Sequence, residues 1–177
     1  MNIVLIGYRG AGKSTVARLL AWKLGWPWVD ADVEIELKAG KSIAAIFADE
    51  GEAAFRDLET MVLAELLDRN GLIIAAGGGA VLRETNRRRL RERGRVVWLR
   101  AEPAALMART AADATTAQRR PNLTTAGGAA EVEAILRERI PLYEQCAELS
   151  LDTDRKPPVE IAAEIARHFN LSPTEPL

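Results

Sequence analysis

Residues 7–15, GYRGAGKST, carry the most specific chemical pattern in the chain, a match to GxxxxGK[ST]. They follow the apolar run of residues 3–6 and open an amphipathic stretch, so a strand is expected to turn here into a helix. The glycines let the turn point its N–H groups inward, and the helix adds its positive end, which together make a nest for phosphate oxygens. Lys13 would place its charge on the β and γ phosphates, and Ser14 would ligate a bridging magnesium ion. A plain glycine-rich turn does not need Lys and Ser at this spacing, so the segment predicts nucleotide binding. The expected contacts come from Gly10, Ala11, Gly12, Lys13, Ser14 and Thr15.

Two aspartates, Asp30 and Asp32, follow the short apolar run 28–29. Proteins with such a phosphate loop usually place a metal-binding carboxylate after another core strand, but the apolar run 72–76 ends in three glycines instead. At the carboxyl end of a neighbouring strand, Asp30 and Asp32 could face the magnesium ion and the phosphate acceptor. A lone aspartate here would more simply cap the helix that starts near Val33, but the presence of two favours a functional role.

The glycine triplet, Gly77, Gly78 and Gly79, is costly in chain entropy. Such a run indicates a backbone that something approaches closely, and a hydroxylated substrate is a candidate. A tight turn after a strand is the alternative, although it would normally need fewer glycines.

Short apolar runs alternate with stretches of helical periodicity, which predicts a parallel sheet with crossover helices. The expected strands are residues 3–6, 28–29, 72–76, 96–99 and 149–151. The expected helices are residues 13–24, 33–38, 43–48, 52–69, 84–93, 103–112, 131–144 and 158–169. The predicted fold class is α/β, a three-layer α/β/α sandwich with a central five-stranded parallel sheet of the P-loop NTPase type. Ligands are then expected outside the carboxyl ends of the strands.

The length of 177 residues suits a single domain, which we expect over residues 1–170. Residues 112–130 have no apolar period, cluster threonine and alanine, and contain the pair Arg119-Arg120, so a mobile loop is predicted there. The tail, residues 171–177, is expected to be disordered.

The charges nearly balance, with 24 Lys and Arg against 25 Asp and Glu and a formal net charge of -1. No global field would draw the protein to nucleic acid or to an anionic membrane, so small ligands are expected. The arginine-rich run over residues 83–93 is interpreted as a solvated helix face. Cys146 and His168 are the only residues of their types, which excludes an intrachain disulfide and a Cys/His zinc cluster and favours a reducing compartment. With no room for a signal peptide before the loop and no apolar stretch near the ~20 residues of a membrane span, a cytoplasmic protein is expected.

In order, these features resemble shikimate kinase, and the resemblance runs from Ile3 to about Arg155. After the phosphate loop and the two aspartates comes GEAAFRDLE at residues 51–59, which is similar to the family's GExxFRxxE stretch. The glycine triplet follows, then Arg120-Pro121 in the loop and the stretch RIPLY at residues 139–143. Each motif alone is weak, whereas the ordered set is highly specific.

The resemblance implies a magnesium-dependent, monomeric kinase. It would move the γ-phosphoryl group of ATP to the 3-hydroxyl of shikimate, on the route to chorismate and the aromatic amino acids. Lys13, Asp32 and Arg120 would be its catalytic residues. Asp32 would accept hydrogen bonds from the substrate hydroxyls and take the proton, and Asp30 would join Ser14 on the magnesium side. Arg120 would close over the phosphates from a lid at residues 112–130, although Arg119 beside it could take that role.

Substrate contacts also follow from the resemblance. Arg56 and Arg139 match the family's two carboxylate-binding arginines, and guanidinium forks suit a planar carboxylate. The helical region 32–60 and the backbone of Gly77, Gly78 and Gly79 would complete the shikimate site. Arg109 and Arg155 match positions on the adenine side of the ATP site.

Two other functions remain to be separated from this one. Another small-molecule kinase of related build, such as a gluconate kinase, is argued against by the setting of Arg56 and Arg139. A nucleotide-gated switch protein lacks support because the chain has neither a DxxG after a strand nor an NKxD motif.

Overall fold

A five-stranded parallel sheet forms the centre of the computed structural model, which describes residues 1–112 and 128–173. Its strands are β1 (Asn2–Ile6), β2 (Trp28–Asp30), β3 (Ile73–Ala75), β4 (Gly94–Arg100) and β5 (Leu149–Asp152). They lie in the order β2-β3-β1-β4-β5, and every neighbouring pair is parallel. The predicted fold class is therefore confirmed, and all strands present their carboxyl ends at one edge of the sheet.

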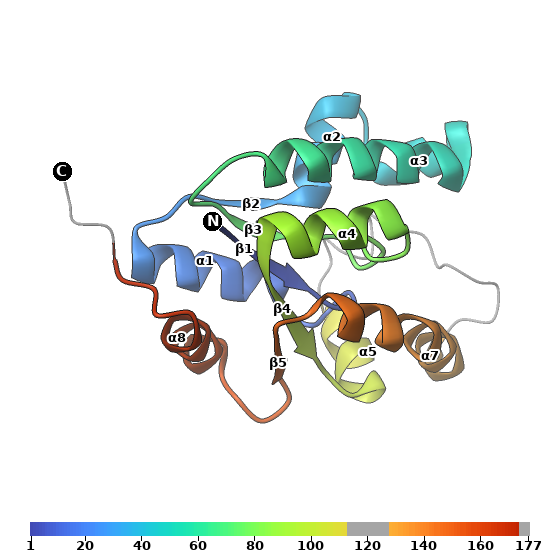
Figure 1. Ribbon diagram of the computed structural model, residues 1–177. Helices are drawn as coiled ribbons and strands as arrows, with labels where there is room; N and C mark the ends of the chain where they lie inside the picture. The colour runs from blue at the N-terminus through green and yellow to red at the C-terminus, as the bar shows by residue number, and fades with distance from the viewer. Residues whose placement is uncertain (113–127, 174–177) are drawn as a thin grey trace.

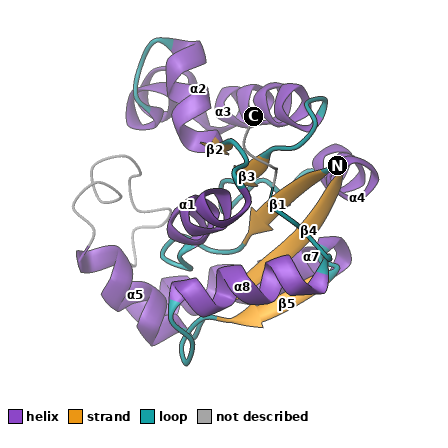
Figure 2. Cartoon of the chain, turned by 90° about the vertical axis from the view of Figure 1, so that its left-hand side faces the viewer, coloured by secondary structure: helices purple, strands orange, loops and turns teal. Residues whose placement is uncertain are grey.

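Helices cover both faces of this sheet (Figures 1 and 2). They are α1 (Lys13–Leu24), α2 (Ala31–Ala39), α3 (Ile43–Leu67), α4 (Glu84–Arg93), α5 (Pro103–Ala112), α7 (Gly128–Cys146) and α8 (Pro158–His168). Helices α1 and α8 pack together on one face, while α3, α4 and the end of α7 cover the other. The layers follow from right-handed crossovers between parallel strands.

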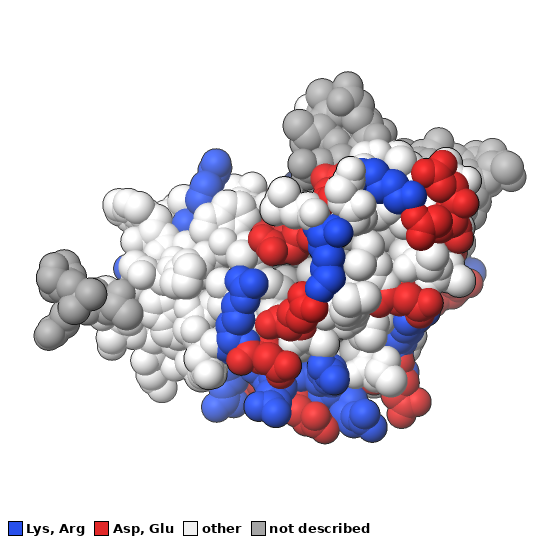
Figure 3. Space-filling model, turned by 90° about the horizontal axis from the view of Figure 1, so that it is seen from above, with Lys and Arg blue, Asp and Glu red and all other residues white. Residues whose placement is uncertain are grey.

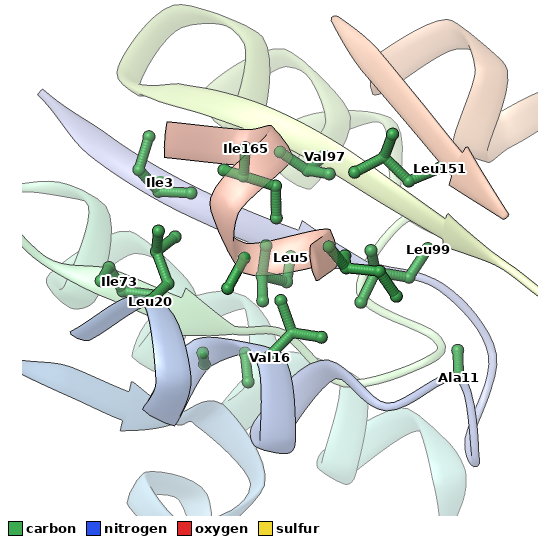
Figure 4. Packing of buried hydrophobic residues seen from close by; sticks show 14 of the residues in the cluster. Ile3, Leu5, Ala11, Val16, Leu20, Ile73, Val97, Leu99, Leu151 and Ile165 are labelled. Atoms are coloured by element: carbon green, nitrogen blue, oxygen red, sulfur yellow. The ribbon is translucent and has the colours of Figure 1, made fainter. Parts of the chain in front are cut away.

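Strand β1 shows how the sequence fills both layers. All five of its residues are buried, and because side chains alternate along a strand, Ile3 and Leu5 enter one core while Val4 and Ile6 enter the other. Figure 4 shows the first core, where strand residues meet the inner faces of α1 and α8. Its members include Val16, Leu20, Ile73, Val97, Leu99, Leu151 and Ile165.

Two helices, α2 and α7, begin earlier than the sequence predicts. Helix α2 begins at Ala31, so Asp32 lies in its first turn rather than before it. The two helices expected at 43–48 and 52–69 correspond to the two parts of α3, which meet at a kink where Gly51 has non-helical geometry (φ 83°, ψ 175°). Such a backbone conformation is essentially restricted to glycine, so the predicted break at Gly51 is confirmed.

The early start of α7 shortens the predicted loop at residues 112–130. Helix α5 runs to Ala112 and α7 already begins at Gly128, so both ends of that loop are helical. The glycine pair suggested a longer loop, but Ala129 and Ala130 are strong helix formers that extend α7 at its start. The rest of the loop, with Arg119 and Arg120, lies outside the described residues, as do residues 174–177 of the tail.

The visible surface carries charges of both signs. Figure 3 shows the top of the molecule as oriented in Figure 1, where Lys and Arg side chains are interspersed with Asp and Glu. Arg83, which precedes α4, pairs with Asp57 at 2.7 Å, and Arg87 of α4 donates to the carbonyls of Val81 and Leu82 at 2.8 and 2.9 Å. Part of the arginine-rich run is thus engaged within the fold. Within residues 1–112 and 128–173, none of the helices has the length and apolar character that a bilayer crossing requires.

Candidate active site

The phosphate loop connects β1 to α1 and opens onto a cavity of about 810 Å³. Gly7, Gly10 and Gly12 all have positive φ, at 140°, 79° and 87°, as the expected curl of the backbone requires. The Lys13 ammonium lies over the loop and donates to the carbonyls of Gly7 at 2.9 Å and Tyr8 at 2.8 Å. These bonds hold a positive charge at the mouth of the nest, beside the helix N-terminus.

Most of the predicted site residues line this single cavity. They are Gly10, Ala11, Gly12, Lys13, Ser14, Thr15, Asp30, Asp32, Gly77, Gly78, Arg109 and Arg155. They come from the phosphate loop, from the carboxyl ends of β2 and β3, from α5 and from the loop after β5. Three predicted residues, Arg56, Gly79 and Arg139, do not line this cavity, and Arg120 is outside the described residues.

Ser14 and Asp30 both line the cavity, and the Ser14 hydroxyl donates to Asp30 Oδ2 at 2.6 Å. The other carboxylate oxygen, Oδ1, accepts from the backbone N–H of Asp32 at 3.0 Å and caps α2. The cap interpretation of Asp30 is therefore confirmed, while its role at a magnesium ion stays a prediction, for which the oxygen bonded to Ser14 is available. Two hard oxygen donors this close suit magnesium, which takes few protein ligands and completes its shell with water and phosphate. The described residues contain no group of three acidic, His or Cys side chains that could enclose a metal on their own.

Arg56 lies in α3 and is almost fully buried, at 7% relative exposure. Its Nη1 donates to Glu59 Oε2 at 2.8 Å, and its Nε and Nη2 donate to Glu52 Oε1 at 3.2 and 3.0 Å. A guanidinium carries its charge at any physiological pH, so burial without such carboxylates would be very costly. The spacing explains the arrangement, since residues three and four positions apart share one helix face.

The glycine triplet packs against both predicted carboxylate-binding arginines. A Cβ on Gly79 would lie only 2.3 Å from Arg56 Nη1, so a side chain at this position would displace the guanidinium. The Gly78 carbonyl accepts from Arg139 Nη1 at 3.2 Å. The sequence indicated a close approach to this backbone, and the structure identifies one partner as the Arg56 guanidinium.

Arg109 is tied to the loop that follows β5. It donates to the Thr153 hydroxyl and carbonyl, both at 2.9 Å, and to Asp154 Oδ1 at 3.1 Å. Asp154 Oδ2 also accepts from the backbone N–H of Glu102 at 2.7 Å, just before α5. This one carboxylate therefore connects both ends of α5 to the loop that carries Arg155.

Three supporting residues were given no role on the basis of the sequence. Glu52 and Glu59 could have been found from their helical spacing to Arg56. Asp154 has no comparable signal, because its partners Glu102 and Arg109 lie far away along the chain. Only the fold brings Asp154 close to Glu102 and Arg109.

The sheet order and the loop after β1 place this chain among the P-loop nucleotide-binding proteins of the α/β class. Within that class its family is specific: a family model described as shikimate kinase matches residues 9–170, and the chain belongs to the shikimate kinase family.

Individual relatives agree with this membership over nearly full length. The chain is 50% identical to a shikimate kinase of Rhodopirellula baltica over 166 residues, which are 94% of this chain and 89% of the relative. It is 46% identical to a shikimate kinase of Pseudomonas savastanoi, covering 97% of this chain and 98% of the relative. Among solved structures, a shikimate kinase from Acinetobacter baumannii in complex with shikimate matches with a TM-score of 0.89 at 39% identity, covering 96% of this chain and 92% of that one.

Proposed function

We propose that the chain transfers the γ-phosphoryl group of ATP to the 3-hydroxyl of shikimate, releasing ADP and shikimate 3-phosphate for chorismate biosynthesis. The family membership and the shikimate complex of the Acinetobacter baumannii relative support this substrate. One group of residues in this chain would bind the nucleotide, and a second group would bind the acceptor.

One observation carries the proposal: the glycine turn at Gly78 contacts both the cavity beside the phosphate loop and the two arginines predicted to bind the acceptor's carboxylate. Gly78 lines the large cavity beside the phosphate loop, and its carbonyl accepts from Arg139 while the next residue lies against Arg56. A phosphate-binding cavity therefore shares a wall with two buried guanidinium groups. A small ring that carries a hydroxyl and a carboxylate could place the hydroxyl in the cavity and the carboxylate at the guanidinium groups.

On the nucleotide side, the loop N–H groups and Lys13 would bind the β and γ phosphates. Ser14 and Asp30, whose oxygens lie 2.6 Å apart, would hold Mg²⁺. When bound, the ion would neutralise charge on the transferring phosphoryl group. Arg109 and Arg155 would lie on the adenine side of the cavity.

On the acceptor side, Asp32 would orient the 3-hydroxyl and take its proton. The hydroxyl oxygen forms a bond to the γ-phosphorus, the bond from that phosphorus to the β–γ bridging oxygen breaks, and ADP leaves with that oxygen. Because the transition state is loose, positioning and charge neutralisation contribute more than proton removal. Arg120, outside the described residues, would add positive charge from a lid at residues 112–130, and Arg119 is the alternative.

We assign one kinase domain to residues 1–170, with the helical region 32–60 on the shikimate side. A monomer is sufficient because every proposed group comes from one chain. A cytoplasmic location stays a prediction of the sequence.

A coupled assay for ADP release tests the function directly, with shikimate, gluconate or no acceptor added to the protein, ATP and Mg²⁺. We expect stimulation by shikimate alone. Stimulation by gluconate would identify a different small-molecule kinase. ADP release that does not depend on either acceptor would indicate a nucleotide-gated protein.

A further inference from the structure

Tyr143 is the last residue of the RIPLY stretch and lies one helical turn after Arg139 on α7. It is fully buried, and its ring stacks on Trp98 of β4 with centroids 5.6 Å apart and planes 26° apart. Its hydroxyl donates to the Gly78 carbonyl at 2.6 Å, and Arg139 Nη1 donates to the same oxygen at 3.2 Å. Two side chains from one face of α7 thus hold one carbonyl of the glycine turn.

That turn depends on outside contacts for its shape. Glycines have no side chains to pack, so three in a row leave a backbone with wide conformational freedom. The Gly77 and Gly79 carbonyls are held locally, by the N–H groups of Ala80 at 3.1 Å and Leu82 at 3.0 Å. The Gly78 carbonyl is held across the fold by α7, and because a peptide unit is planar, fixing this oxygen also fixes the peptide that joins Gly78 to Gly79.

The two donors differ in what they can do next. A carbonyl oxygen has two lone pairs and accepts both bonds in this state. If the Arg139 guanidinium turns to a substrate carboxylate, the buried carbonyl still keeps the Tyr143 hydroxyl. Without that hydroxyl, engaging a substrate would leave the carbonyl unsatisfied, so Arg139 would stay with Gly78.

We propose that Tyr143 is a positioning residue for the acceptor site: its hydroxyl satisfies the Gly78 carbonyl and thereby allows Arg139 to bind the acceptor's carboxylate. This role requires the hydrogen bond from the hydroxyl to Gly78 and not the ring's stack on Trp98, which contributes to packing. This inference rests on the proposed shikimate kinase function, and it assigns Tyr143 a role in acceptor affinity rather than in the chemical step.

The test is Tyr143→Phe, which removes one oxygen and keeps the ring. We expect the KM for shikimate to rise about fivefold to tenfold, the range for one net hydrogen bond, with the KM for ATP within about twofold of wild type. KM does not depend on how much of the enzyme is folded, so a loss of stability does not obscure the result. An unchanged shikimate KM would overturn the proposal.

Two further variants separate positioning from packing. Trp98→Phe weakens the ring stack while leaving the hydroxyl, so it should lower the melting temperature and leave the shikimate KM close to wild type. If it raises that KM as much as Tyr143→Phe does, Tyr143 acts only through packing and the proposal fails. In an Arg139→Ala background, Tyr143→Phe should change shikimate affinity much less than in wild type, because both residues act on one carbonyl. Additive effects would count against the proposal.

Failure of this inference and failure of the proposed function give different results. If wild-type protein does not phosphorylate shikimate, the function itself is wrong. If wild type does so and Tyr143→Phe has the wild-type KM, only the role of Tyr143 is wrong.

Discussion

Arg56 Nη1 lies 2.8 Å from Glu59 Oε2, and both side chains are buried, at 8% and 3% relative exposure. The remaining edge of the guanidinium, Nε and Nη2, contacts one oxygen of Glu52, whose side chain is 58% exposed. The buried carboxylate therefore fixes Arg56 in place, while an exposed carboxylate occupies the fork that an incoming substrate carboxylate would use.

We expect Glu59→Gln to lower the free energy of unfolding by about 3 kcal/mol, because removing one partner leaves a buried charge poorly compensated. Urea unfolding measures this. Glu65→Gln is the matched control on the same helix, since Glu65 pairs with Lys38 at the surface and should cost less than ~1 kcal/mol. Equal losses of unfolding free energy in the two variants would show that the buried pair stabilises the fold no more than the surface pair.

Glu52→Gln should tighten shikimate binding about twofold to fivefold, because the substrate carboxylate no longer displaces a charged competitor worth up to ~1 kcal/mol. Titration calorimetry with shikimate checks the affinity. Glu50→Gln removes the same charge from an exposed pair with Lys41 and should leave shikimate binding unchanged. Weaker binding by Glu52→Gln would mean that Glu52 orients Arg56 rather than competing for it.

Lys13→Ala should reduce turnover by at least ~100-fold and leave shikimate affinity near wild type, since its charge acts on the phosphates. Steady-state kinetics and an equilibrium titration of shikimate provide the two readings. Lys23→Ala, on the exposed side of the same helix, is the control and should behave like wild type. Wild-type turnover in Lys13→Ala would contradict the assignment of the nucleotide site.

Asp154→Ala should raise the KM for ATP severalfold, because it removes one of the ties on Arg109 and the bond to the Glu102 N–H. The KM for shikimate serves as the internal control and should not change, because Asp154 lies on the side of the cavity formed by the loop after β5. If both KM values rise together, the substitution has disturbed the whole cavity rather than the nucleotide side.

Burial raises the pKa of the Cys146 thiol, an effect that the charges of Arg91 and Arg87 partly offset. The thiol of the unfolded chain ionises near pH ~8.5, so this burial contributes its full stability below that pH. As the pH rises from there through the higher pKa of the folded state, the contribution is lost. In urea titrations between pH 7.5 and 10, we expect the free energy of unfolding to fall more for wild type than for Cys146→Ala. We also expect Cys146 in the folded protein to react slowly with a thiol reagent at pH 8. A fast reaction at that pH would show that the thiol is accessible.

Much of the fold could be predicted because its signals are local. The strand and helix periodicities located all five strands, and α1, α4 and α5 were predicted with the bounds that the structure has. The boundaries that failed include the starts of α2 and α7, where each helix begins earlier than the local signal predicted. The same local logic found the phosphate loop, whose glycines, lysine and serine are consecutive in the chain.

The sequence by itself determined the nucleotide-binding loop, the α/β class and the family, because each depends on residue types at short, fixed spacing. The tertiary structure alone decided how the site is supported. The contact of Gly79 with Arg56, the shared Gly78 carbonyl of Arg139 and Tyr143, and the ties from Asp154 to α5 all join residues distant in the chain. Such contacts depend on the order of strands in the sheet and on the packing of helices over it, and no short stretch of sequence encodes either.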